Sequence, residues 1–135
     1  MQISIDTSSE IVEIGLYDLQ AKIIGNESWK SEHNESEVLI KKIGDLLNAN
    51  KVQKDKLKRV VVCMGYGSYT ALRVGISAAN LLAYGLDIPV VGYEKSSDNL
   101  NIQKTLKTKI GDKFEKAVLP LYKKDPKITA KKSRR

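Results

Sequence analysis

VVVCMGYGSYTALRVGISAANLLAY, residues 60–84, is the segment with the clearest structural pattern in the chain. Its first five residues are apolar and mostly β-branched, which is typical of a central strand buried on both faces. Gly65-Tyr66-Gly67-Ser68 then makes a tight connection, and residues 69–84 are apolar or small apart from one narrow polar stripe. The segment therefore predicts a buried strand, a short turn and a long helix.

The other elements follow from hydrophobic patterns on either side of this segment. Three strands without intervening helices indicate a meander at the start of the chain. A helix capped by Asn34 follows, a further strand carries Pro89, and a last helix is expected between Ser97 and Gly111. The expected strands are 2–6, 11–17, 20–30, 60–64 and 88–91. This order predicts an α/β fold with a mixed five-stranded sheet, the plan of a single actin/hexokinase-like (ribonuclease-H-like) lobe.

The basic residues are concentrated at the C-terminal end of the chain. The 135 residues carry a net charge of +7, and the segment from Lys123 to Arg135 holds seven basic residues and one acidic residue. That segment accounts for +6, so the other 122 residues are nearly neutral. We therefore expect a single lobe over residues 1–122 and a basic tail over residues 123–135. Such a tail usually binds nucleic acid or another polyanion, and a solubilising role is the alternative.

The composition also indicates the cellular compartment of the protein and which kinds of metal or redox site it can form. Cys63 is the single cysteine and His33 the single histidine, so neither a disulfide nor a histidine-rich metal site is expected. Cys63 lies inside the apolar run, which favours a core position over a nucleophile. Met1 leads directly into the first strand, and no run reaches the ~18 apolar residues of a membrane span. We expect a cytoplasmic protein with no membrane segment.

Several of these stretches resemble a known family. Residues 65–75, GYGSYTALRVG, are similar to the Gly-Pro-Gly-Ser-Phe-Thr-Gly-Leu-Arg-Val-Gly signature of the TsaB (YeaZ) family, with Tyr66, Tyr69 and Ala71 as the departures. Residues 5–9, IDTSS, resemble that family's first strand and turn. Weaker similarities lie at His33 with the helix after it, at residues 87–92, and at residues 119–123.

The resemblance implies a role in tRNA modification. It implies a non-catalytic scaffold that dimerises with a TsaD-type catalytic subunit, which threonylcarbamoylates the tRNA adenosine next to the anticodon. ATP and metal are then expected in partner subunits and no cofactor in this chain. A TsaE-type ATPase and a second copy of the chain are further candidate partners. The family's second lobe is replaced here by residues 95–122, a short remnant. The candidate tRNA contacts are the basic residues of the tail, Lys127, Lys131, Lys132, Arg134 and Arg135.

A row of small residues recurs every four positions on the long helix and lets another element approach closely. Either this ridge lies on the chain's own sheet or it packs against a helix of a partner. The family resemblance favours the partner, because TsaB packs this helix and the preceding one against TsaD or against itself. The expected partner interface comprises Leu39, Ile43, Leu46, Ala71, Arg73, Gly75, Ala79 and Ala83.

A nucleotide site is the alternative function. Asp6 ends the first strand, where phosphotransferases of the superfamily hold a metal-bound phosphate, and glycines before a helix N-terminus can form an anion site. The glycine spacing matches neither a dinucleotide fingerprint nor a P-loop, so a purely structural turn remains open. The candidate nucleotide contacts are Asp6, Thr7, Ser8, Gly65, Gly67 and Ser68. A third possibility is an RNA-binding module that depends on the tail alone.

Overall fold

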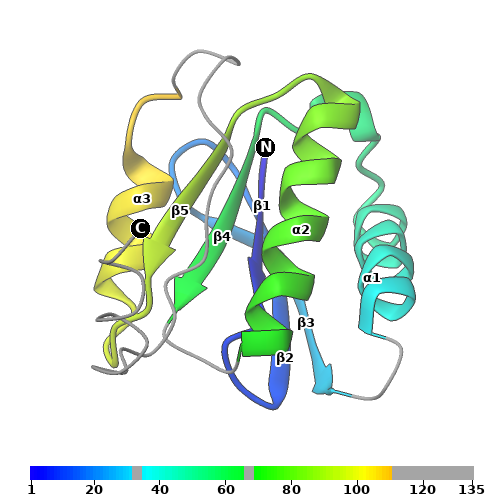
Figure 1. Cartoon of the computed structure of the whole chain (residues 1–135). Helices are drawn as coiled ribbons and strands as arrows, with labels where there is room; N and C mark the ends of the chain where they lie inside the picture. Colours follow the sequence, from blue (N-terminus) through cyan, green and yellow to red (C-terminus); the bar gives the residue numbers. More distant parts are fainter. Residues whose placement is uncertain (32–34, 66–68, 111–135) are drawn as a thin grey trace, which may run out of the picture.

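The computed structural model describes residues 1–31, 35–65 and 69–110, which form one five-stranded sheet with helices on both faces (Figure 1). The elements are β1 (Gln2–Asp6), β2 (Ile11–Tyr17), β3 (Ile23–Lys30), α1 (Glu35–Ala49), the 3-10 turn η1 (Lys54–Lys56), β4 (Arg59–Gly65), α2 (Tyr69–Leu86), β5 (Val90–Glu94) and α3 (Leu100–Lys107). The predicted α/β fold and the order of its elements are confirmed.

The strands lie in the order β3-β2-β1-β4-β5, so β1 is central. It pairs with β2 antiparallel and with β4 parallel, while β3 joins β2 antiparallel and β5 joins β4 parallel. The sheet is therefore mixed, as predicted. Because β1, β4 and β5 are parallel, their carboxyl ends meet at one edge of the sheet, which is where open α/β sheets bind ligands.

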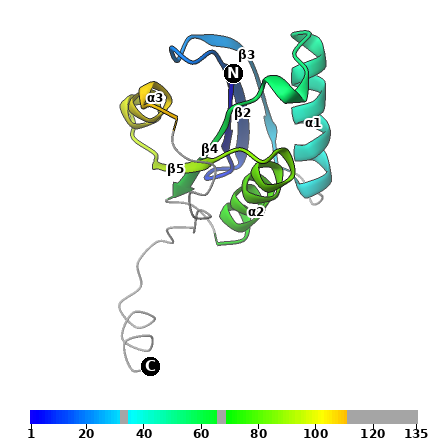
Figure 2. The same ribbon diagram turned by 90° about the horizontal axis from the view of Figure 1, so that it is seen from above.

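The two faces of the sheet differ in chemistry because side chains alternate along each strand. Ile3 and Ile5 of β1 are fully buried in the main core beneath α1 and α2. Ser4 and Asp6 alternate with them and point to the other face, where they line a polar cleft beside α3. Figure 2 shows α1 and α2 on one side of the sheet and α3 on the other.

Strand β4 is apolar on both faces, as its sequence predicts. Val60 and Val62 belong to the main core with α1 and α2. Val61 and Cys63 belong to a smaller cluster on the opposite face, which also contains Leu106 of α3. The strand is thus covered on both sides, which explains its uninterrupted run of β-branched residues.

Helix α3 is held against the sheet by a buried arginine. Arg59 is 2% exposed, and its guanidinium donates to Oε1 of Gln2 and to the carbonyl of Leu106, 3.2 Å away. A cation at a helix C-terminus is favourable because the last carbonyls carry partial negative charge. The predicted end of this helix at Gly111 is wrong: α3 ends at Lys107, where side chains of the sheet bind its terminal carbonyls.

The ends of the other elements shift by a few residues. Helix α2 extends beyond Tyr84 to Leu86, and β5 begins at Val90 rather than at Ile88. The proposed N-cap, Asn34, lies outside the described residues. Over the residues that the structure describes, we find no helix that could serve as a membrane span.

Candidate functional site

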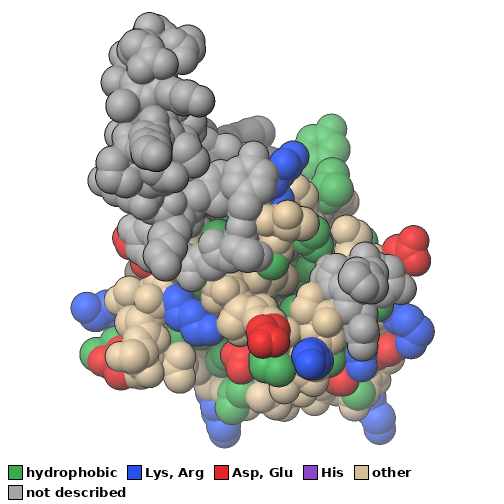
Figure 3. Space-filling view, turned by 60° about the horizontal axis from the view of Figure 1, so that its bottom comes forward, with side chains coloured by type: hydrophobic (Ala, Val, Ile, Leu, Met, Phe, Trp, Pro, Cys, Tyr) green, Lys and Arg blue, Asp and Glu red, His purple; other side chains and the backbone are tan. Residues whose placement is uncertain are grey.

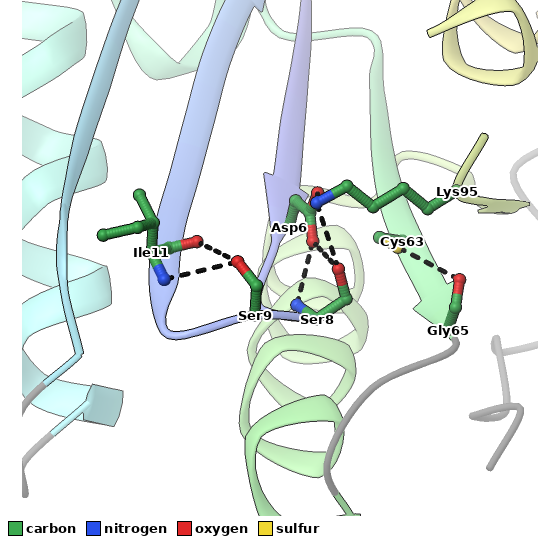
Figure 4. Close-up of polar contacts among 7 residues, drawn as sticks. All are labelled: Asp6, Ser8, Ser9, Ile11, Cys63, Gly65 and Lys95. Carbon is green, nitrogen blue, oxygen red and sulfur yellow. Dashed lines mark hydrogen bonds and ion pairs between the residues drawn. The ribbon is translucent and has the colours of Figure 1, made fainter. Parts of the chain in front are cut away.

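Asp6 ends β1 at the carboxyl edge of the sheet, and both of its carboxylate oxygens have partners (Figure 4). Oδ1 accepts hydrogen bonds from the backbone N–H of Ser8 at 2.8 Å and from its Oγ at 2.6 Å. Oδ2 forms an ion pair with Nζ of Lys95 at 3.1 Å. The Asp6 side chain is only 9% exposed, so its charge is balanced mainly by these neighbours.

Lys95 follows β5 directly and connects three parts of the chain. Its backbone N–H donates to the carbonyl of Gly65 at 3.1 Å, and its Nζ lies 3.5 Å from Oγ of Ser8. Burial lowers the pKa of Lys95, but attraction to Asp6 outweighs it, so the pKa is raised above its ordinary value. The ammonium is therefore charged at neutral pH and neutralises Asp6.

Thr7 and Gly65 have structural tasks at the same edge. Oγ1 of Thr7 donates to the carbonyl of Ala71 in the first turn of α2, at 2.7 Å. The Thr7 side chain fills the space beside Gly75, where any Cβ would collide with it. Gly65 has a φ of 150°, which a side chain would strain, and the β4–β5 register shifts beside it.

The structure thus brings together four of the predicted nucleotide contacts, Asp6, Thr7, Ser8 and Gly65. Their polar groups are engaged with one another and with the adjoining backbone. Gly67 and Ser68 lie outside the described residues. Figure 3 views the molecule from the edge where β1, β4 and β5 end, and basic and acidic side chains lie beside one another on its coloured part.

Cys63 is a core residue, as predicted. Its thiol is buried and lies 3.5 Å from the carbonyl of Gly65. Burial raises the pKa of the Cys63 thiol, and the negative charge of Asp6 raises it further. The thiol is therefore protonated at neutral pH and unsuited to nucleophilic attack.

A polar cleft, which no sequence pattern predicted, lies between α3 and the first three strands. Its volume is about 180 Å³. Asp6 lines it together with Glu13, its partner in the β1–β2 register, and with Lys95. Glu13, which alternates with the buried Val12 and Ile14 along β2, was a signal that this face is not packed as a core. Across the described ranges, no group of three or more histidine, cysteine, aspartate and glutamate side chains is arranged to hold a metal ion.

The predicted partner interface is largely wrong, because most of its residues are covered by the chain itself. Leu39, Ile43 and Leu46 of α1, and Ala79 and Ala83 of α2, all lie in the main core. Gly75 is also buried, against Thr7. The ridge of small residues lets α2 lie close to its own sheet, and the spacing alone could not tell this surface from a partner.

A different part of α2 faces solvent. Arg73, which was predicted at the interface, is exposed, while Ala71 is half-buried. Leu81 is 67% exposed and Tyr84 is 87% exposed. We call Arg73, Ser77, Leu81 and Tyr84 the outer α2 surface. The five candidate tRNA contacts of the tail lie outside the described residues.

Several proteins are similar to the chain in sequence. A family model described as TsaD, tRNA N6-adenosine threonylcarbamoyltransferase, matches residues 23–95, more than half of the chain. The tRNA threonylcarbamoyladenosine biosynthesis protein TsaB of Bacillus subtilis (strain 168) is 33% identical over 88 residues, which are 65% of this chain and 38% of the relative. TsaB of Buchnera aphidicola subsp. Schizaphis graminum (strain Sg) is 33% identical over 91 residues, 67% of this chain and 42% of the relative.

Solved structures have the same fold. YeaZ from Pseudomonas aeruginosa superposes with a TM-score of 0.61 at 22% identity, covering 69% of this chain and 42% of YeaZ. A crystal structure of a protein with similarity to peptidase YeaZ, from the same organism, has a TM-score of 0.63 at 22% identity and the same coverage. The chain spans less than half the length of each of these relatives. From the signature, the fold and these similarities together, the chain belongs to the TsaB (YeaZ) family.

Proposed function

We propose that this chain is a non-catalytic subunit in the biosynthesis of threonylcarbamoyladenosine in tRNA. Its partner is a TsaD-type catalytic subunit, which holds the metal and transfers the threonylcarbamoyl group to the adenosine beside the anticodon. The TsaB relatives are named for this biosynthesis. The ion pair between Asp6 and Lys95 supports a non-catalytic role, since it engages the carboxylate that would serve a phosphotransferase.

The outer α2 surface is the part of the chain that we propose binds the TsaD-type subunit. Leu81 and Tyr84 lie one helical turn apart and expose large apolar areas. Burying such a side chain in an interface gains roughly 1.5–3 kcal/mol relative to leaving it in water. Tyrosine and arginine are also the residues that most often dominate binding energy, and Arg73 lies on the same surface. The opposite side of α2 packs on the sheet, so this surface is held rigid.

The test is binding of a purified TsaD-type subunit to the whole chain, measured by calorimetry and by mass in solution. We expect a stoichiometric complex. The double variant Leu81→Ala/Tyr84→Ala should bind at least about tenfold more weakly, a loss of about 1.4 kcal/mol or more. Its thermal stability should stay close to that of the wild type, since both side chains are exposed.

Leu19→Ala is the matched control. Leu19 is also an exposed leucine, 46% accessible, but it lies in the turn between β2 and β3. It should bind the TsaD-type subunit as the wild type does. Equal binding by the double variant and the wild type would remove the outer α2 surface from the proposal. Failure of the wild-type chain to bind at all would refute the proposal itself. The mass of the chain alone tests whether a second copy takes the partner's place.

A minimal ATP-binding lobe is the second candidate. Asp6, Thr7, Ser8 and Gly65 meet at the edge of the sheet where α/β folds bind ligands, which favours this function. ATP turnover by the pure chain, lost in Asp6→Asn, would support it over the scaffold.

The basic tail extends the scaffold proposal to tRNA. Seven basic residues between Lys123 and Arg135 can bind the phosphate backbone, with Lys127, Lys131, Lys132, Arg134 and Arg135 as the contacts. A TsaE-type ATPase is a further candidate partner of the same assembly. An RNA-binding module that acts through the tail alone would bind tRNA equally well with and without that subunit.

A further inference from the structure

The fold family implies a metal-bound phosphate beside the carboxylate that ends the first strand, and the groups around Asp6 do not fit it. We propose that Lys95 is a built-in counter-ion that occupies the cation position at Asp6 and keeps this carboxylate from binding a metal ion. The inference concerns the edge of the sheet and holds whether or not the outer α2 surface binds a partner.

Both oxygens of the Asp6 carboxylate are already engaged by groups of this chain. A carboxylate can accept about four hydrogen bonds. The Asp6 carboxylate already accepts from three donors: the Ser8 N–H, the Ser8 hydroxyl and the Lys95 ammonium. A hard divalent cation would need to approach an oxygen to roughly 2.0–2.6 Å. The ammonium lies 3.1 Å from Oδ2, so the two cations cannot share this oxygen without strong repulsion.

The backbone after β5 fixes Lys95 next to Asp6. Lys95 is fixed at the end of β5 by the hydrogen bond from its own N–H to the carbonyl of Gly65. Its side chain is 41% exposed, yet Nζ reaches inward across the carboxyl edge to Asp6 and Ser8 (Figure 4). The ammonium thus links the ends of β1 and β5 beside the Asp6 carboxylate.

The surroundings show what would remain if the ammonium were removed. Glu13 is opposite Asp6 in the β1–β2 register, and both line the polar cleft. Side chains opposite each other in an antiparallel pair have Cβ atoms about 4.5–5.5 Å apart, close enough for two carboxylates to bind one ion. Ser28, opposite Glu13 on β3, lines the cleft as well. Such oxygen groups suit Mg²⁺, Ca²⁺ or Mn²⁺.

The experiment uses Mn²⁺ alone as the probe, followed by electron paramagnetic resonance and calorimetry on the full chain. The variant Lys95→Met keeps the length of the side chain and removes its charge. We expect it to bind one Mn²⁺ at least tenfold more tightly than the wild type. Adding Asp6→Asn to the variant should abolish the gain. Lys104→Met, which removes an exposed lysine from α3, is the matched control and should bind as the wild type does.

Three results would overturn the proposal. The first is a Lys95→Met variant that binds Mn²⁺ as weakly as the wild type. The second is a gain in Mn²⁺ affinity that survives Asp6→Asn. The third is a wild type that already binds one Mn²⁺ as tightly as the variant. Because Lys95→Met leaves a buried charge, the melting temperature of each variant is also measured with and without Mn²⁺. A rise confined to Lys95→Met, and absent from Lys95→Met/Asp6→Asn, supports the proposal, since a ligand stabilises only the state that binds it. A melting temperature of Lys95→Met that Mn²⁺ does not raise has the opposite meaning and counts as the first overturning result.

Discussion

Gly75 is the position at which the packing of α2 on the sheet can be tested most directly. A Cβ on residue 75 would lie 2.8 Å from Cγ2 of Thr7 and 3.1 Å from its Cβ, and closer still to Oγ1. Thr7 cannot easily move away, because its Oγ1 donates to the carbonyl of Ala71 at 2.7 Å. Its β-branched side chain is also stiff about χ1. Gly75→Ala should therefore destabilise the fold, although alanine is the better helix former.

The size of the effect follows from three contributions. Forcing a methyl group into a packed contact costs about 1–3 kcal/mol. Displacing the Thr7 hydroxyl from its acceptor costs about 1 kcal/mol more. Replacing a mid-helix glycine with alanine returns about 1 kcal/mol through helix propensity. The net loss should be about 1–3 kcal/mol in the free energy of unfolding, measured by urea denaturation.

Gly44→Ala is the matched control, since Gly44 lies within α1 and a Cβ there meets nothing within 4 Å. It should be stabilising by up to about 1 kcal/mol, so the two glycine variants differ in sign. In a Thr7→Ala background the two nearest obstacles disappear, and Gly75→Ala should then cost much less. A coupling free energy below about 0.5 kcal/mol in this double-mutant cycle would refute the reasoning. So would a Gly75→Ala variant as stable as the wild type.

Three further predictions concern other parts of the chain. Arg59→Met should cost about 1–3 kcal/mol, because it leaves the buried oxygens of Gln2 and Leu106 without their donor, and hydrogen exchange should detect the loss of protection first in α3. Burial raises the pKa of Tyr93, so above the ordinary value of 10.0 the unfolded chain releases a proton that the native state keeps. Stability should therefore fall with rising pH by about 1.4 kcal/mol per unit there, and a Tyr93→Phe variant with an equally steep decline would contradict this. Removing residues 123–135 should reduce the log–log salt slope of tRNA binding by about 0.7–0.9 for each lost phosphate contact, and an unchanged slope would leave the tail a solubilising role.

The fold could be predicted because its strongest signals are local. The run from Val60 to Met64 is apolar on both faces, and the structure buries it on both faces. The ends of elements were less predictable because they depend on distant partners. Strand β5 starts late because the N–H of Ile88 still bonds to the carbonyl of Ala83 at the end of α2. The end of α3 depends on Arg59, far away in sequence, which no local pattern could reveal.

The site was predicted in part for the same reason. Asp6 and Gly65 each end a parallel strand, so their meeting at one edge follows from the predicted topology. The ion pair between Asp6 and Lys95 does not follow, because it depends on the side-chain path after β5. The small residues of α2 indicated a close contact correctly, but a row such as Ala79 and Ala83 fits a sheet as well as a second helix. The burial of these residues in the structure shows that they face the sheet, which the sequence spacing could not show.

The pairing of β1 with β4 has a consequence for how the chain acquires its structure. Gln2 lies opposite Arg59 in this parallel ladder. Strand β1 therefore gains β4 as its second neighbour only when the intervening chain, more than forty percent of the sequence, has been closed into a loop. Closing so long a loop is slow, and folding rates fall as contacts become more distant in sequence. The meander of β1, β2 and β3 can form early, but its apolar face remains exposed to water until α1, β4 and α2 pack against it. We therefore expect the β1–β4 association to limit the folding rate, and the unfinished meander to be the species most exposed to aggregation.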